Sequence, residues 1–165
     1  MMMTKKSPPP DDEFIKPLMN LALSEAKLAI EHGDVPVGAV VARRDSGLVI
    51  AHTHNQKERD NDPTAHAEIL ALRQAASVLG SWRLSECLLV VTLEPCTMCA
   101  GACTAARIGQ VIYGATDPKA GALGSLYHFG SDPRLNHEYS VTGGVQAQAG
   151  GELLTDFFSD KRSQA

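Results

Sequence analysis

The chain has 165 residues, of which 15 are Lys or Arg and 19 are Asp or Glu, and 44% of its residues are hydrophobic. This length suits one domain with a core of its own. The formal net charge of −4 excludes a protein that holds nucleic acid mainly by bulk positive charge, so any nucleic-acid contact must be local.

The first ten residues contain two lysines and three consecutive prolines but no hydrophobic core region of the kind that a signal peptide has. We therefore expect a disordered leader over residues 1–10, and neither a signal peptide nor a membrane span. A single domain should follow over residues 11–162, with a short C-terminal tail at 163–165. Four cysteines without an apolar leader indicate a reducing, cytoplasmic location.

The first third of the chain predicts a helix followed by a β-hairpin. Apolar side chains at helical spacing predict a helix that begins at Asp11 or Asp12 and ends at Gly33. Two short apolar runs, 35–42 and 48–51, flank a polar turn and predict two paired strands.

The middle of the chain predicts a second helix and then a strand, a helix and a strand. Asp62 and Pro63 are favourable residues for the start of the second helix, which should end at Gly80. An apolar strand at 87–91, a helix of small residues at 96–107 and a strand at 111–114 follow. This order predicts a parallel strand pair joined by a crossover helix.

The last third of the chain has weaker signals. Residues 115–136 are rich in Gly, Pro and Asp and show little periodicity, which predicts a long loop with at most a short helix. A weak strand at 139–142 precedes a last helix, whose apolar face should include Leu154, Phe157 and Phe158.

The strongest chemical signal is a pair of cysteines, Cys96 and Cys99, at the start of the helix that follows Pro95. Residues at i and i+3 share a helical face. His66 lies at the start of another predicted helix, and Cys and His are ligands that zinc prefers. Three protein ligands leave the fourth position open to water, which is typical of a catalytic zinc site. We therefore predict one zinc ion (Zn2+) per subunit on His66, Cys96 and Cys99.

Glu68, two residues after His66, indicates the type of chemistry. Residues at i and i+2 lie on nearly opposite helical faces, so both can reach one site only if it lies over the helix N-terminus. Cys96 has the same constraint, and we expect two helix N-termini to converge on the metal. His-x-Glu followed by Pro-Cys-x-x-Cys is the signature of zinc-dependent nucleobase deaminases, in which the glutamate transfers protons. Glu68 is the predicted catalytic acid and base.

Two other interpretations of this cluster remain open. Cys103, at i+4 from Cys99, is a possible fourth ligand of a structural zinc site, although its apolar helix favours a place in the core. A zinc-stabilised binding protein without catalytic activity is the alternative from another functional class. Replacement of Glu68 by Ala distinguishes an enzyme from such a protein.

Beyond this signature, the chain resembles the bacterial tRNA-specific adenosine deaminases of the cytidine deaminase superfamily over nearly all of residues 14–158. The matching segments are Val35-Pro36-Val37-Gly38-Ala39-Val40, Asn55, Asp62-Pro63-Thr64-Ala65-His66-Ala67-Glu68, Thr92-Leu93-Glu94-Pro95-Cys96, Met98-Cys99-Ala100-Gly101-Ala102, Arg107-Ile108, Tyr113-Gly114, Gly121-Ala122 and Asp156-Phe157-Phe158.

The resemblance implies an α/β fold, a three-layer α/β/α sandwich with a five-stranded mixed sheet in a single deaminase domain. It also implies a homodimer, no membrane attachment, no organic cofactor, and hydrolytic conversion of the wobble adenosine in a tRNA anticodon loop to inosine. By the same resemblance Asn55 binds the purine, the backbone amide of Ala67 faces the base edge, and Asp117 lies near the ribose.

Alternatives to these substrate roles also stay open. Asn55 and Asp117 are common turn residues and can serve the loop alone. The same zinc chemistry on a free base or nucleoside, such as guanine or cytosine, is the alternative within the superfamily.

Overall fold

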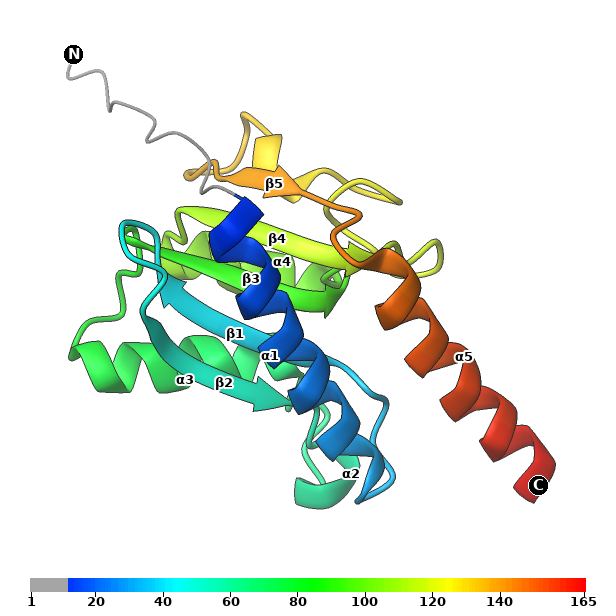
Figure 1. Cartoon of the computed structure of the whole chain (residues 1–165). Coiled ribbons are helices and arrows are strands. Elements are labelled where there is room, and N and C mark those ends of the chain that lie inside the picture. The colour runs from blue at the N-terminus through cyan, green and yellow to red at the C-terminus, as the bar shows by residue number, and fades with distance from the viewer. Residues whose placement is uncertain (1–11) are drawn as a thin grey trace, which may run out of the picture.

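The structure, a computed structural model, describes residues 12–165, so the predicted leader at 1–10 lies outside the described residues (Figure 1). Five strands form one sheet in the order β2-β1-β3-β4-β5. The strands are β1 (Gly38–Arg43), β2 (Val49–His54), β3 (Cys87–Leu93), β4 (Gln110–Ala115) and β5 (Ser140–Thr142). The helices are α1 (Asp12–Ile30), α2 (Lys57–Asp60), α3 (Ala67–Leu79), α4 (Thr97–Ala106) and α5 (Ala147–Gln164), with a short 3-10 helix, η1 (Phe129–Ser131).

The sheet is mixed, as predicted. Strand β1 is antiparallel to both β2 and β3, whereas β3, β4 and β5 run parallel to one another. The predicted hairpin and the predicted parallel pair are therefore confirmed. Parallel strands end at the same edge of a sheet, and here the backbone N–H of Glu94, after β3, donates to the carbonyl of Ala115 at the end of β4 (2.8 Å). The segments that follow these strands begin side by side.

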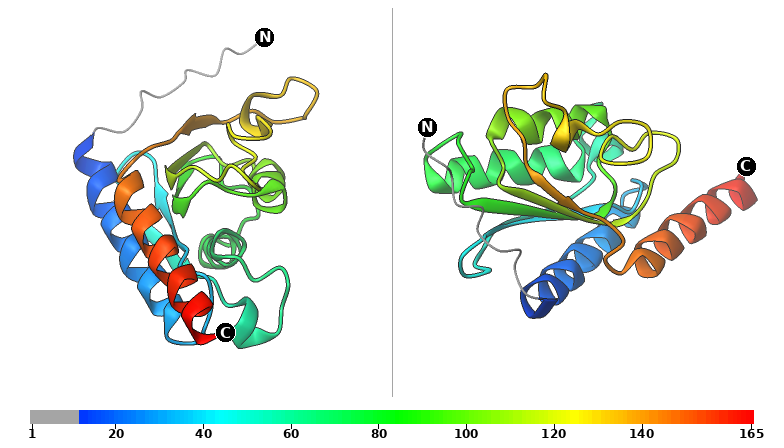
Figure 2. Two further views of the ribbon diagram at one scale, coloured as in Figure 1. Left: turned by 90° about the vertical axis from the view of Figure 1, so that its right-hand side faces the viewer. Right: turned by 90° about the horizontal axis from the view of Figure 1, so that it is seen from above.

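Two layers of helices cover the two faces of this sheet (Figure 2). Alternate residues of β3 point to opposite faces: Leu88 and Val90 belong to the apolar cluster formed with α1, and Leu89 and Val91 to the cluster formed with α3 and α4. Helices α1 and α5 lie together on one side. The predicted three-layer α/β/α sandwich is confirmed. None of the helices in residues 12–165 has the length and apolar character needed to cross a bilayer.

Two helix boundaries and one side chain differ most clearly from the predictions. Helix α3 begins at Ala67 and not near Asp62, because the Asp62 carboxylate accepts the Thr64 N–H (2.8 Å) and forms a local turn. Helix α5 continues to Gln164, so most of the predicted tail at 163–165 is helical. Phe158 was expected on the apolar face of this helix, but it is 44% exposed.

A chain of histidines and carboxylates joins α1 to β2 and α2. Glu25 of α1 accepts from Nδ1 of both His52 (2.5 Å) and His54 (2.7 Å), and the Nε2 atoms of His54 and His32 lie 3.1 Å apart. His32 Nδ1 reaches Asp34 (2.6 Å), which also accepts two backbone N–H groups of α2. Burial acts to raise the pKa of Glu25, but the hydrogen bonds from His54 and His52 outweigh it and lower that pKa. The ionised Glu25 thus joins β2 to α1, and Asp34 holds α2.

We expect replacement of Glu25 by Gln to destabilise the protein at every pH above the pKa of the unfolded glutamate. The folded pKa of Glu25 lies below its unfolded value of about 4.3, so its contribution is complete above that pH and is lost as the pH falls through the folded pKa. Urea unfolding from pH 3 to 7 with a chelator present should show the difference between wild type and Glu25→Gln shrinking below about pH 4. A difference that stays constant would contradict this role.

Candidate metal centre and active site

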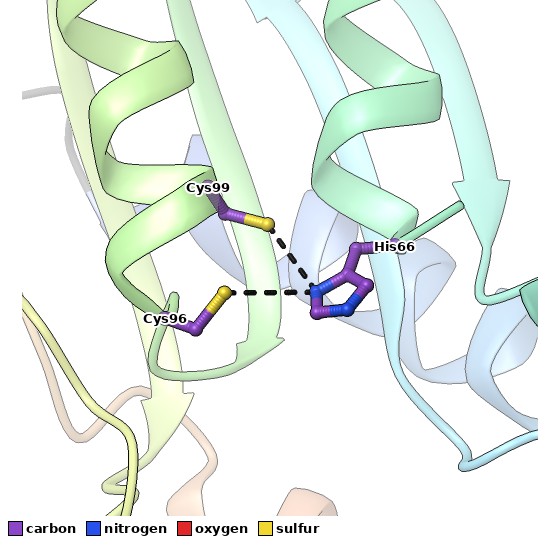
Figure 3. Close-up of side chains that lie close together, drawn as sticks. All are labelled: His66, Cys96 and Cys99. Atoms are coloured by element: carbon purple, nitrogen blue, oxygen red, sulfur yellow. Dashed lines mark hydrogen bonds between the residues drawn. The ribbon is translucent and has the colours of Figure 1, made fainter. Parts of the chain in front are cut away.

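The predicted cluster forms where the N-termini of α3 and α4 meet (Figure 3). His66 immediately precedes α3, and Cys96 immediately precedes α4; both residues have extended backbone conformations. Cys99 lies in the first turn of α4. Because Cys96 precedes the helix and Cys99 is within it, the two thiols converge on the histidine ring from one side (Figure 3). The predicted convergence of two helix N-termini is observed.

The distances within the cluster are short. His66 Nδ1 lies 3.5 Å from Cys99 Sγ and 3.7 Å from Cys96 Sγ, and the three ligand atoms all lie within 4.8 Å of one another. Cys99 is buried, while His66 and Cys96 are partly exposed. The cluster is therefore able to hold a metal ion that remains accessible from one side.

The three side chains of the cluster shift one another's pKa values through hydrogen bonds. A hydrogen bond from the Cys99 thiol, together with one from His66, lowers the pKa of Cys96 to about 3 despite burial. The pKa of Cys99 is raised because its proton is held by the Cys96 thiolate and because the side chain is buried. A metal ion can replace this proton as the counter-charge and allow both sulfurs to ionise.

Glu68 lies in the first turn of α3 and is only 4% exposed. Burial raises the pKa of its carboxyl group, and the nearby His66 acts in the opposite direction. A carboxyl group whose protonated form is favoured by burial is suited to accept and return a proton near neutral pH. The structure thus places Glu68 beside the cluster, as expected, with the environment that a proton-transfer group needs.

Asn55 and Ala67 are bonded to each other. The Asn55 side-chain oxygen accepts the backbone N–H of Ala67 (2.8 Å), and its amide nitrogen donates to the carbonyl of Val35 (3.1 Å). These partners fix the orientation of the amide. The single N–H of Ala67 donates to Asn55 in this structure, so its predicted role at the base edge stays a prediction. The second hydrogen of the Asn55 amide is not used by Val35.

Asp117 is held in a tight turn after β4. Its carboxylate accepts the backbone N–H groups of Lys119 (3.1 Å) and Ala120 (3.2 Å), and its own N–H donates to Glu94 (3.1 Å). The residue is partly exposed. The turn interpretation of Asp117 is thus observed, and its predicted contact with a ribose stays a prediction.

Glu94 belongs to the Thr92–Cys96 motif, and the sequence predicts no role for it. It is 2% exposed and lies directly before Pro95 and Cys96, yet its carboxylate is ionised: burial acts to raise its pKa, and hydrogen bonds from Ser125, Asp117 and Leu123 outweigh it. The sequence signal that could have identified Glu94 as a functional residue is its place, as an acidic residue, at the end of an apolar strand. Its partners are 23 to 31 residues downstream, and no spacing rule identifies them.

Cys103 and Cys87 are not members of the metal-binding cluster. Both are fully buried in the apolar cluster between the sheet and helices α3 and α4. The structure therefore favours the expected packing role for these thiols, and Cys103 does not complete a four-ligand structural site.

The comparisons with known proteins agree with this geometry. The model of a family described as MafB19-like deaminase matches residues 15–162. The chain is 43% identical over 146 residues, 88% of its length, to a tRNA-specific adenosine deaminase of Bacillus subtilis (strain 168), of which it covers 89%.

Solved structures show the same fold. A structure from work on A-to-I editing by tRNA:A34 deaminases at the wobble position of transfer RNA is 46% identical, with a TM-score of 0.80; the match covers 84% of this chain and 99% of that one. A guanine deaminase from Nitrosomonas europaea is 31% identical, with a TM-score of 0.73, over 86% of this chain and 83% of that one. The chain belongs to the family of tRNA-specific adenosine deaminases.

Proposed function

We propose that this protein is a zinc-dependent homodimeric enzyme that hydrolyses the wobble adenosine of a tRNA anticodon to inosine and ammonia, acting in the cytoplasm. The observation that carries the proposal is the convergence of His66, Cys96 and Cys99 beside the buried carboxyl group of Glu68. The identity with tRNA-specific adenosine deaminases over most of the chain favours tRNA as the substrate.

Zinc fits the cluster in both chemistry and size. Two thiolates and one imidazole are a donor set that zinc binds strongly. Tetrahedral zinc, with Zn–S bonds of about 2.3 Å and Zn–N bonds of about 2.0–2.1 Å, places sulfur and nitrogen ligands about 3.6 Å apart. The Sγ–Nδ1 distances of 3.5 and 3.7 Å match this value. His66, Cys96 and Cys99 would hold the ion.

Glu68 performs the proton transfers in this proposal. A bound zinc ion supplies water acidic enough to act as the nucleophile at neutral pH. Hydrolysis at C6 of adenine then requires one proton on a ring nitrogen and another on the departing amine. The Glu68 carboxylate takes one proton from the water and delivers it to the ring nitrogen as the oxygen bonds to C6. It then takes the remaining proton from the hydroxyl group now on C6 and passes it to the amine, which leaves as ammonia. Burial favours the protonated state through which each transfer passes.

Asn55 and Asp117 provide the substrate contacts of the proposal. The amide hydrogen of Asn55 that Val35 does not use is available to a purine nitrogen. Asp117 lies in the segment that approaches Cys96 and is partly exposed, so its carboxylate can reach a ribose hydroxyl. Anticodon nucleotides are largely unpaired, and extruding one into a pocket costs little.

The test is an assay of the zinc-loaded protein on an anticodon stem-loop with adenosine at the wobble position. Free adenosine, guanine and cytosine are assayed in parallel, and inosine and ammonia are measured by mass spectrometry and by enzymatic ammonia detection. Inosine at that position, with the free bases unchanged, supports the proposal. Deamination of guanine in place of the stem-loop would assign the chain to the free-base alternative.

We place the interface of the proposed homodimer at an apolar groove between α3 and α4. The groove has a volume of about 260 Å³ and is lined largely by apolar side chains, including Ile69, Leu72, Ala102 and Trp82. Trp82, in the segment that follows α3, is 60% exposed, and Val78, near the C-terminal end of α3, is 62% exposed. An apolar surface of this kind is typical of a protein–protein contact.

Replacement of Trp82 by Asp should convert the dimer to a monomer. Introducing a charge into a buried apolar contact without a partner is strongly unfavourable. Sedimentation analysis should give twice the chain mass of 17.6 kDa for wild type and a single chain mass for the variant. Leu48→Asp is the matched control, because Leu48 is equally exposed, at 60%, on the turn between β1 and β2. A monomeric wild type would remove the dimer from the proposal.

A further inference from the structure

The buried carboxylate of Glu94 is surrounded by hydrogen-bond donors from one loop. Oε1 accepts the backbone N–H of Asp117 (3.1 Å) and the hydroxyl of Ser125, and Oε2 accepts the backbone N–H groups of Leu123 (3.1 Å) and Ser125 (3.0 Å). Each oxygen thus has two donors. The donors all lie within residues 117–125, which we name the clasp loop.

The clasp loop passes directly against the metal-binding cluster. The backbone N–H of Ala122 donates to the carbonyl of Pro95 (2.9 Å), and Gly121 pairs with Cys96 in an isolated antiparallel bridge. Gly121 lies so close to Glu94 that a Cβ atom built on it would be 2.2 Å from Oε2. The loop can wrap around the carboxylate only because residue 121 has no side chain.

Glu94 connects the cysteine segment of the site to the clasp loop. Its backbone leads through Pro95 to Cys96, and its side chain holds the loop that begins with Asp117. A backbone N–H cannot donate to a carboxylate that has been lost or displaced, and a donor without an acceptor is costly where it is buried, as the Leu123 N–H is. The placement of the loop relative to Cys96 therefore depends on this one carboxylate.

We infer that Glu94 is a positioning residue that holds the clasp loop as a wall of the substrate site. The inference rests on the proposed function for its substrate: the loop carries Asp117, the proposed ribose contact, so the wall faces the nucleotide that enters the site. Glu94 does not touch the reacting atoms. Glu94 affects the reaction by shaping the site that binds the substrate, and it takes no part in proton transfer.

Two substitutions perturb the clasp in different ways. Glu94→Gln replaces one acceptor oxygen with an NH2 group that faces backbone donors. Gly121→Ala keeps the carboxylate but places a methyl group 2.2 Å from Oε2, too close for both atoms to stay in place. For both variants kcat/KM on the stem-loop should fall about ten- to hundredfold, mainly through a higher KM, because charge-assisted hydrogen bonds of this strength are lost. Metal content should stay at one ion per chain.

Ser125→Ala is the matched control, since it removes the hydroxyl and leaves the three backbone bonds to Glu94. Its kcat/KM should fall by at most about threefold. Amide hydrogen exchange supplies a readout that does not require turnover: the N–H groups of Leu123 and Ser125 should exchange faster in Glu94→Gln and Gly121→Ala, while those of β3 should stay protected.

The outcomes separate this inference from the proposed function. Unchanged KM and unchanged exchange in Gly121→Ala would overturn the inference, and so would a loss of kcat alone with KM unaltered. If Glu94→Gln does not fold, the KM and the exchange rates of Gly121→Ala, compared with those of the control Ser125→Ala, test the inference. If the wild type does not deaminate the stem-loop, the proposed function fails, and the exchange rates of the clasp loop still test whether Glu94 holds it.

Discussion

Replacing Glu68 with Gln should lower the rate of stem-loop deamination by about 10²- to 10⁴-fold or more, because one carboxyl group is proposed to make both proton transfers. The glutamine side chain has nearly the same volume, so the buried site should remain packed. Single-turnover measurement of inosine formation reports the chemical step directly.

The control for this variant is its metal content, measured by elemental analysis. Glu68 is not proposed as a ligand, and we expect one zinc ion per chain in both wild type and Glu68→Gln. Full activity in the variant would show that another group moves the protons. Loss of the metal would instead show that the carboxyl group is needed to hold the ion.

Replacing Cys99 with Ala should abolish both metal binding and activity. The buried thiol is one of three proposed ligands, and removing it leaves two, on different segments, that would bind the ion much more weakly. We expect metal content to fall from one ion per chain to a small fraction, and activity to fall at least as far as in Glu68→Gln. Added zinc should raise the thermal midpoint of wild type but not that of the variant.

Cys103→Ala is the matched control for Cys99→Ala. Cys103 is equally buried, lies one turn further along α4, and is outside the cluster. The variant should lose some stability through lost packing but keep its metal ion and its activity. A metal-free Cys103→Ala protein would restore the four-ligand structural site that we considered from the sequence.

Local patterns account for what the sequence predicted well. The strand and helix order follows from apolar periodicity, and the cluster follows from the spacing of Cys96 and Cys99 and from His66 at a helix start. These features depend on neighbours a few residues away. The start of α3 was predicted too early because Asp62 forms a local turn, which is an equally common use of aspartate before a helix.

The features that the sequence did not predict depend on distant segments. The four hydrogen bonds of Glu94 require the exact path of the clasp loop past Cys96, and that path has no periodicity. The histidine and carboxylate chain at Glu25 joins residues up to 29 positions apart whose spacing matches no known motif. Phe158 turned outward because α5 covers the sheet with only part of its surface.

The place of His66 and Cys96, each just before the first turn of a helix, has a consequence for how the protein matures. The two residues are 30 positions apart and meet only when α3 and α4 are both docked on the sheet. A partly folded chain therefore offers at most the two thiols of one segment to an ion. An ion that needs all three side chains can therefore be held only after both helices have docked, and its binding would in turn stabilise the docked arrangement.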